Sequence, residues 1–408
     1  MEQNVKKIKR SIKVFPLFAA FSSDLIFFVP IDTLFLTLVK GLTASQITAM
    51  TMVSLALCIA LQKVILRMVE KIGNIKSLKL GALMLLIASV ILTFGSSFTA
   101  MLVYRCLYEI AFMFLHMSRI VLKNNLTAIN KQDDYYKIRN RAKILYSIIT
   151  IITALLAGTL FNINNYLPMY LSVFVYMVML GMSFIFYEAK LENNDDKQED
   201  IKRKKLKITS TIFLIILSNA VFYSIIKMGQ NNSKLFMQYD FQEFLSIEMV
   251  TYYITTIVFL SRLVRLAGNV VFGKLYLKIK DKLSIVLSVL LSMAFFLLIL
   301  GHFLSIGFIY KVIIMSLGFF LILAIRDSFQ VYIEDIALTI ANKEDQQEMM
   351  IDIEVYRKVG TLILSALFTL ILMKFELIII ECILCLLAIV EIGISCRLCK
   401  KLSQNTGK

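Results

Sequence analysis

The sequence predicts an all-α membrane protein with about twelve transmembrane helices, and three observations lead to this class. Of the 408 residues, 59% are hydrophobic and the mean hydropathy is +0.78, whereas soluble domains contain about 45–50% apolar residues. The apolar runs are long and unbroken, as in 208–217 and 283–300, unlike the roughly ten-residue alternating segments of a membrane β-barrel. At about 20 residues per span, the chain accommodates on the order of twelve helices.

The predicted spans follow one another with short polar connections. The first is too long for the apolar region of a signal peptide, so we expect it to be retained as a span. The eleventh is expected to begin earlier than its most apolar part, near Ile353. The predicted spans are 14–39, 46–66, 76–96, 100–122, 143–162, 167–188, 208–228, 246–272, 283–303, 312–335, 359–373 and 376–396.

Lysine and arginine are concentrated in alternate connections. The N-terminal tail and the connections after the second, fourth and sixth spans are rich in both, while the other loops contain only isolated lysines, namely Lys40, Lys234, Lys311 and Lys374. By the positive-inside rule, this asymmetry predicts a multi-pass protein of the plasma membrane with both termini in the cytoplasm. The net charge of +16 therefore reports topology, and we expect no nucleic-acid partner.

One polar stretch divides the chain. Residues 188–207 read EAKLENNDDKQEDIKRKKLK, an acidic run followed by a basic one, which is typical of a solvated cytoplasmic linker. The predicted organisation is an N-terminal six-helix bundle at 1–189, a linker at 190–207 and a C-terminal six-helix bundle at 208–408.

The loop between the second and third spans carries a recognisable motif. Leu66-Arg67-Met68-Val69-Glu70-Lys71-Ile72-Gly73-Asn74-Ile75-Lys76 resembles the G-x-L-x-D-R-x-G-R-K loop of the major facilitator superfamily. Glu70, Lys71 and Gly73 fit that pattern, whereas Leu66 replaces its leading glycine. A second fragment follows the eighth span and keeps the G-x-L opening, although Leu277 stands where an acid is expected: Gly273-Lys274-Leu275-Tyr276-Leu277-Lys278-Ile279-Lys280.

The resemblance to this superfamily covers the whole chain at the level of architecture, and it implies a bacterial 12-helix secondary transporter. We expect each fragment to form a tight turn closed by glycine, so Glu70, Lys71, Gly73, Gly273 and Lys278 are candidate gating-loop residues. The alternative is that both fragments are ordinary basic turns.

Charged residues inside the spans are the candidate functional residues. An ionised group at the bilayer centre costs about 2.5–3.5 kcal/mol on insertion scales, so each one requires a partner, a wet cavity or a function. In the superfamily, helices 1, 4, 7 and 10 line a central cavity. On that resemblance, the substrate and proton pathway would include residues of spans 1, 4 and 10, although structural ion pairs remain the alternative for each: Asp24, Asp32, Arg105, Glu109, Arg326 and Asp327.

Geometry on ideal helices constrains how these charges act. Asp24 and Asp32 are eight residues apart, about 12 Å along a helix and about 80° around it, so they could serve successive positions but not share one proton. Arg105 and Glu109 lie on one face at i,i+4. We expect Asp32 to pair with Arg105, which lies at a similar depth, when the protein is inward-facing.

The twelfth span has three carboxylates. Glu376 and Glu391 lie near its ends and are expected to reach the interfaces, whereas Glu381 is expected to be protonated or paired with a neighbouring helix. Two Cys-x-x-Cys motifs occupy the same span, but their outermost sulfurs would be roughly 25 Å apart. We therefore expect no metal site and no cofactor.

The predicted function is secondary active transport of a small molecule by alternating access, without chemistry on the substrate, so no enzymatic activity is expected. Proton-coupled export by a monomer is the preferred form, with sodium as the alternative coupling ion. The competing hypotheses are a non-transporting receptor and a lipid flippase of the same fold.

Overall fold

The computed structural model describes residues 2–24, 26–131, 134–189, 209–304, 307–340 and 346–406, and within these ranges the chain is helical with no strand. It divides into two compact units. The first comprises Met1–Leu42 and Val53–Asp200, and the second comprises Thr43–Met52 and Ile201–Lys408. The linker predicted at 190–207 lies outside the described residues.

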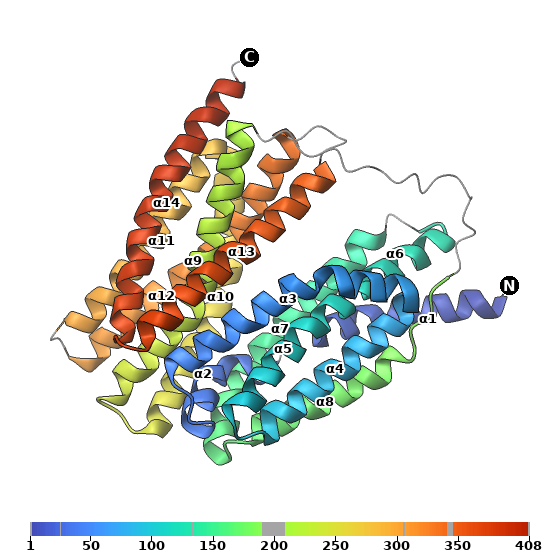
Figure 1. Ribbon diagram of the computed structural model, residues 1–408, viewed down its shortest axis with the longest axis horizontal. Coiled ribbons are helices and arrows are strands. Elements are labelled where there is room, and N and C mark those ends of the chain that lie inside the picture. Colours follow the sequence, from blue (N-terminus) through green and yellow to red (C-terminus); the bar gives the residue numbers. More distant parts are fainter. Residues whose placement is uncertain are drawn as a thin grey trace. The chain divides into compact units, whose positions relative to one another are not determined.

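The first unit contains the helices drawn from blue to green in Figure 1. Helix α4 is its centre, because it packs against α5, α6 and α8, while α1 packs against α6, α7 and α8. The elements are α1 (Glu2–Phe21), η1 (Val29–Ile31), α2 (Asp32–Leu34), η2 (Phe35–Val39), α3 (Ala44–Ile72), α4 (Asn74–Phe94), α5 (Phe98–Leu115), α6 (Met117–Ala128), α7 (Asp134–Ile163) and α8 (Leu167–Ser183). The first residues of α3 group with the second unit.

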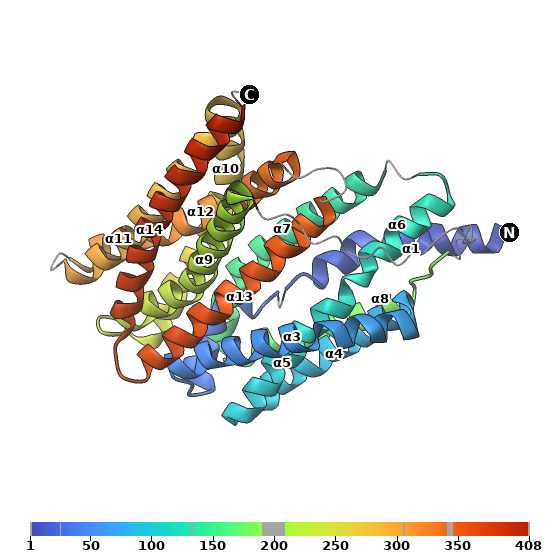
Figure 2. The same ribbon diagram turned by 45° about the horizontal axis from the view of Figure 1, so that its top comes forward.

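The second unit is built around α9, α11, α12 and α14. Helix α9 packs against α12, α13 and α14, and α12 packs against α10 and α11, as Figures 1 and 2 both show. The elements are α9 (Ser210–Gln242), α10 (Ile247–Ile279), η3 (Lys280–Lys282), α11 (Leu283–Phe303), α12 (Phe308–Ile340), α13 (Gln346–Leu372) and α14 (Leu377–Thr406).

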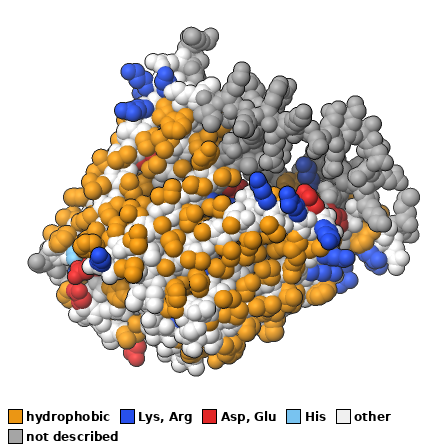
Figure 3. Space-filling view, viewed as in Figure 1, with side chains coloured by type: hydrophobic (Ala, Val, Ile, Leu, Met, Phe, Trp, Pro, Cys, Tyr) orange, Lys and Arg blue, Asp and Glu red, His pale blue; other side chains and the backbone are white. Residues whose placement is uncertain are grey.

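The helices have the length and surface of membrane spans. Ten of those described are long and apolar enough to cross a bilayer, and two shorter apolar segments, Val29–Val39 and Leu167–Ser183, occupy the predicted first and sixth spans. Large side chains such as Phe94, Leu370 and Leu386 are more than 60% exposed, and hydrophobic side chains cover most of the face in Figure 3. Since soluble monomers rarely expose such patches, the predicted fold class is confirmed, with a helix count of about twelve.

The single helix predicted over 14–39 is wrong. Helix α1 begins at Glu2 and ends at Phe21, and short helical turns replace it from Val29 onward. The Ser22 and Ser23 hydroxyls donate to the carbonyl of Ala19 at 3.3 and 2.5 Å, which competes with continued helical pairing. Pro30 then removes a backbone donor. The break leaves Asp24 in a turn inside the unit.

Two further expectations need correction. Gly273 does not close a turn, because it lies within α10, which continues to Ile279; the reversal is made at Lys280, whose φ is +38°. Glu391 does not reach an interface, because its side chain is fully buried. By contrast, Gly73 separates α3 from α4 with a φ of +83°, a conformation that favours glycine.

Candidate functional site: an aspartate held by three tyrosines

Asp24 is the centre of a hydrogen-bonded cluster in the first unit. Tyr108 of α5 donates to its Oδ1 at 2.7 Å, and Tyr146 of α7 donates to Oδ2 at 3.4 Å. Tyr176 of α8 donates to the Asp24 main-chain carbonyl at 2.8 Å. Three helices therefore converge on one residue that the break after α1 has freed from regular helical pairing.

Two tyrosines of this cluster are buried inside the first unit. Tyr108 is 7% exposed and Tyr176 is 1% exposed, so neither phenol can exchange its partner for bulk water without movement of a helix. Buried polar groups are costly when unpaired. The Tyr108 hydroxyl therefore depends on the Asp24 carboxylate for its hydrogen bond, and the Tyr176 hydroxyl depends on the Asp24 main-chain carbonyl.

Arg105 and Glu109 extend the cluster along α5. Their side chains pair at 2.9 Å and remain about one-fifth exposed. The Arg105 guanidinium also lies 5.4 Å from the ring centre of Tyr108, within the range of a cation–π contact. A connected set thus runs from Glu109 through Arg105 and Tyr108 to Asp24.

Asp32 lies in α2, where its Oδ1 accepts a hydrogen bond from the backbone N–H of Thr33 at 2.6 Å. Its side chain makes further interactions. The predicted pairing of Asp32 with Arg105 stays a prediction.

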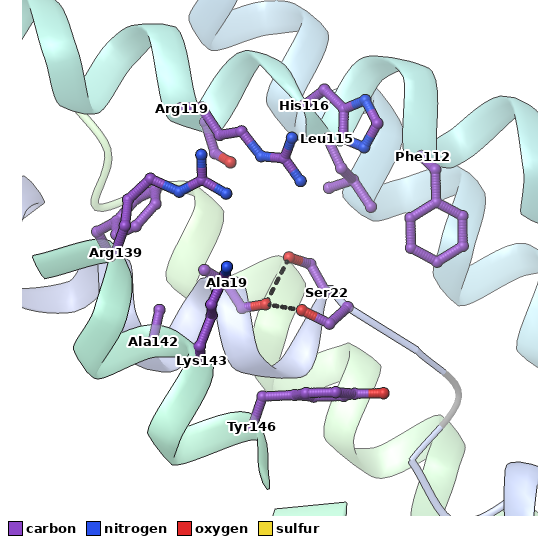
Figure 4. Close-up of a pocket in the computed structure, with 13 residues that line it drawn as sticks. Ala19, Ser22, Phe112, Leu115, His116, Arg119, Arg139, Ala142, Lys143 and Tyr146 are labelled. Carbon is purple, nitrogen blue, oxygen red and sulfur yellow. Dashed lines mark hydrogen bonds between the residues drawn. The ribbon is translucent and has the colours of Figure 1, made fainter. Parts of the chain in front are cut away.

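A cavity of about 290 Å³ adjoins Asp24. It lies between the end of α1, the interruption at His116 that separates α5 from α6, and the first part of α7. Figure 4 shows the basic groups of Arg119, Arg139 and Lys143 pointing into the same space. Tyr146 belongs to both features, since it lines the cavity and donates to Asp24.

In the second unit, Arg326 and Asp327 are held by different helices. The Arg265 guanidinium of α10 binds both carboxylate oxygens of Asp327, at 2.6 and 2.9 Å. Arg326 instead donates to Gln230 of α9 at 3.0 Å, and its Nε is 3.9 Å from Asp327. The two adjacent charges therefore connect α12 to two neighbouring helices.

A close helix approach positions this ion pair. Gly268 lies one turn beyond Arg265, and a Cβ built on it would lie 2.5 Å from the carbonyl oxygen of Ala324 and 2.9 Å from its Cα. Only glycine allows the backbones of α10 and α12 to come this near. Arg265 was not among the predicted site residues, although its charge inside the eighth span would have selected it.

The predicted gating residues differ in their surroundings. Glu70 and Lys71 are exposed at the end of α3, as is Lys278 at the end of α10. In the loop between α3 and α4, the side-chain amide of Asn74, which follows Gly73, donates to Glu188 Oε1 at 2.7 Å. The side-chain amide of Asn124 donates to the same oxygen at 2.8 Å. The loop is therefore fixed to the segment that follows α8.

Serines donate to one oxygen of each buried carboxylate of α14, Glu381 and Glu391, while the other oxygen of each has no hydrogen-bond partner among the described residues. Ser233 of α9 donates to Glu381 at 3.1 Å. Glu391 accepts from Ser218 at 2.5 Å and from Ser395 at 3.2 Å. Among the described residues, no group of three or more His, Cys, Asp or Glu side chains is arranged to hold a metal ion.

Comparison with known proteins decides the family. The sequence profile described as Major Facilitator Superfamily matches residues 14–338. The chain belongs to the major facilitator superfamily. Its membership, and its transporter neighbours among solved structures, point to a membrane transporter for a small molecule rather than an enzyme.

Solved structures of superfamily fold match nearly the whole chain at low identity. A bacterial homologue of the iron transporter ferroportin, in an inward-facing state, gives a TM-score of 0.70 at 13% identity and covers 97% of this chain and 98% of its own. The nucleoside transporter NupG gives 0.69 at 11%, covering 96% and 98%. A bacterial homologue of the human lysosomal transporter Spinster gives 0.62 at 11%, covering 96% and 94%. No curated protein matched the sequence.

Proposed function

We propose that this protein is a proton-coupled secondary transporter that exports a small molecule by alternating access. The observation that carries the coupling is the position of Asp24, which lies in a break of the first span and is held by tyrosines from α5, α7 and α8. The pathway would include Asp32, Arg105 and Glu109 in the first unit and Arg326 and Asp327 in the second.

The physical argument is that protonation of Asp24 changes what the surrounding helices bind. An ionised Asp24 accepts hydrogen bonds from two phenols, whereas a protonated one has an O–H donor of its own. A proton therefore alters the bonds between the turn after α1 and two helices of the same unit. A ligand or proton shifts a conformational equilibrium only by such differential interaction.

The gating proposal concerns the loop between α3 and α4. Gly73 permits its turn, Glu70 and Lys71 are exposed beside it, and Asn74 binds Glu188. We place this loop in the cytoplasm together with both termini, since it is among the lysine- and arginine-rich connections. The protein would act as a monomer in the plasma membrane, surrounded by lipid.

Flux in proteoliposomes tests the proposal. The purified chain is reconstituted with a pH gradient of either sign, and candidate solutes are screened for movement that follows the gradient. We expect solute and protons to move in opposite directions, and Asp24→Asn and Asp32→Asn to reduce net flux. Flux that ignores the pH gradient but follows a sodium gradient would overturn proton coupling. Binding of solute without any flux would favour a receptor instead.

A further inference from the structure

The cavity beside Asp24 has an unusual charge balance. Three cationic side chains, Arg119, Arg139 and Lys143, together with His116, are among its thirteen lining residues, and none of the thirteen is acidic. The basic residues come from two different helices and from the interruption between α5 and α6. Figure 4 shows the guanidinium groups of Arg119 and Arg139 and the ammonium group of Lys143 directed into the same space.

Helix geometry explains why α7 contributes so strongly. Arg139, Ala142, Lys143 and Tyr146 follow the i, i+3, i+4, i+7 spacing of one helix face. Arg141 lies between them in sequence but points elsewhere, since it is exposed and does not line the cavity. Helix α7 therefore offers a matched control, because Arg139 and Lys143 line the cavity and Arg141 does not.

The remaining walls are apolar or hydroxylated. Phe15, Phe112 and Leu115 supply apolar surface, while Ser22 and Ser23 add hydroxyl groups that donate to the Ala19 carbonyl. The volume of about 290 Å³ lies just below the range of about 300–1,000 Å³ that is usual for ligand pockets. A small solute fits this space better than a drug-sized one.

We propose that this cavity binds the oxyanion of a small amphipathic molecule, a carboxylate, sulfonate or phosphate on a short apolar body. Arginine and lysine donate charge-assisted hydrogen bonds to such groups, and the phenylalanines pack against the body. The proposal that the cavity binds an anion depends only on its geometry. The proposal that this anion is the transported substrate rests on the proposed transport function. Tyr146 would then connect the bound anion to Asp24, since it lines the cavity and donates to Asp24.

The test uses two probes that stay anionic near neutral pH and one neutral analogue. Benzenesulfonate and phenyl phosphate are titrated calorimetrically into the full chain in phosphatidylcholine nanodiscs, with benzenesulfonamide as the neutral analogue. We expect both anions to bind at least about tenfold more tightly than the sulfonamide, because a hydrogen bond to a charged group contributes about 1.5–3 kcal/mol, a factor of ten or more.

Matched variants locate the binding. Lys143→Gln and Arg139→Gln should each weaken anion binding about tenfold, whereas Arg141→Gln should leave it unchanged. Equal weakening by Arg141→Gln would show a diffuse surface attraction and overturn the proposal. Equal affinity for anions and sulfonamide, or no anion binding by correctly folded protein, would overturn it too.

Two further arms separate the possible conclusions. At an ionic strength high enough to screen the surface charge, suppression of anion binding by phosphatidylglycerol nanodiscs assigns the oxyanion to a lipid headgroup, and unchanged binding assigns it to a free solute. Flux driven by a pH gradient without anion binding would refute the cavity proposal and leave transport standing. Anion binding without any flux would refute transport and leave the cavity standing.

Discussion

Replacement of Gly268 by alanine tests the close approach of α10 and α12 that brings Arg265 to Asp327. The new Cβ would lie 2.5, 2.9 and 3.0 Å from the oxygen, Cα and carbonyl carbon of Ala324. All three atoms belong to the backbone, so no side-chain rotation relieves the overlap. The helices must separate, and the bidentate contact of Arg265 with Asp327 must lengthen.

The expected change in the free energy of unfolding follows from two opposing effects. Overpacking of a well-packed interface costs about 1–3 kcal/mol, while alanine gains about 0.5–1 kcal/mol over glycine in a helix. Gly273→Ala is the matched control on the same helix, since no atom lies within 4 Å of its Cβ position. Only the favourable effect applies there. The two variants should therefore differ by about 1–3 kcal/mol, with Gly268→Ala the less stable.

Thermal unfolding in one detergent, followed by circular dichroism or by size exclusion of heated samples, measures the difference. At about 2–4 °C per kcal/mol for chains of 150–250 residues, and less for a longer chain, we expect the Gly268→Ala midpoint to fall several degrees below that of Gly273→Ala. Equal midpoints would refute the inference that backbone contact at Gly268 sets the α10–α12 spacing.

Three other predictions concern charges and their donors. Arg265→Met and Asp327→Asn should each lower the unfolding midpoint, and the double variant should lose less than the sum because the pair is broken once; additive losses would show that the pair contributes nothing. Burial lowers the pKa of Lys40 from 10.5, so the unfolded chain binds more protons than the folded chain just below pH 10.5, and stability should rise with pH there. Lys40→Met should remove that rise just below pH 10.5, measured by the unfolding midpoint, and an unchanged slope would contradict it. Ser233→Ala leaves the buried Glu381 without its donor and should cost about 1–3 kcal/mol, again measured by the unfolding midpoint; a loss below 0.5 kcal/mol would count against the bond.

The fold class and the positions of individual charged residues within the spans were predictable, because both depend on local sequence. Apolar runs and the distribution of lysine and arginine predict spans, and the i,i+4 spacing of Arg105 and Glu109 places both on one helix face, where the structure pairs them. The break after α1 was missed because hydropathy averages over Ser22, Ser23 and Asp24 within an apolar window. Gly273 was misassigned because a motif position does not determine where a helix ends.

The tyrosine cluster and the basic cavity were missed for different reasons. A tyrosine in an apolar span carries no special signal, so the convergence of Tyr108, Tyr146 and Tyr176 appears only once three helices are packed together. The lysine and arginine residues after the fourth span were fully accounted for as a topology signal. Nothing in the sequence indicated that Arg139 and Lys143 would also line a cavity that Arg141 does not.

The most direct test of the central claim compares two kinds of transport in the Asp24→Asn variant. Counterflow exchange of labelled solute needs only alternating access, whereas accumulation driven by a pH gradient also needs the coupled proton. If Asp24 is the proton-binding group, the variant should retain exchange and lose gradient-driven accumulation, while the wild type shows both. Accumulation at the wild-type level in Asp24→Asn would contradict the account.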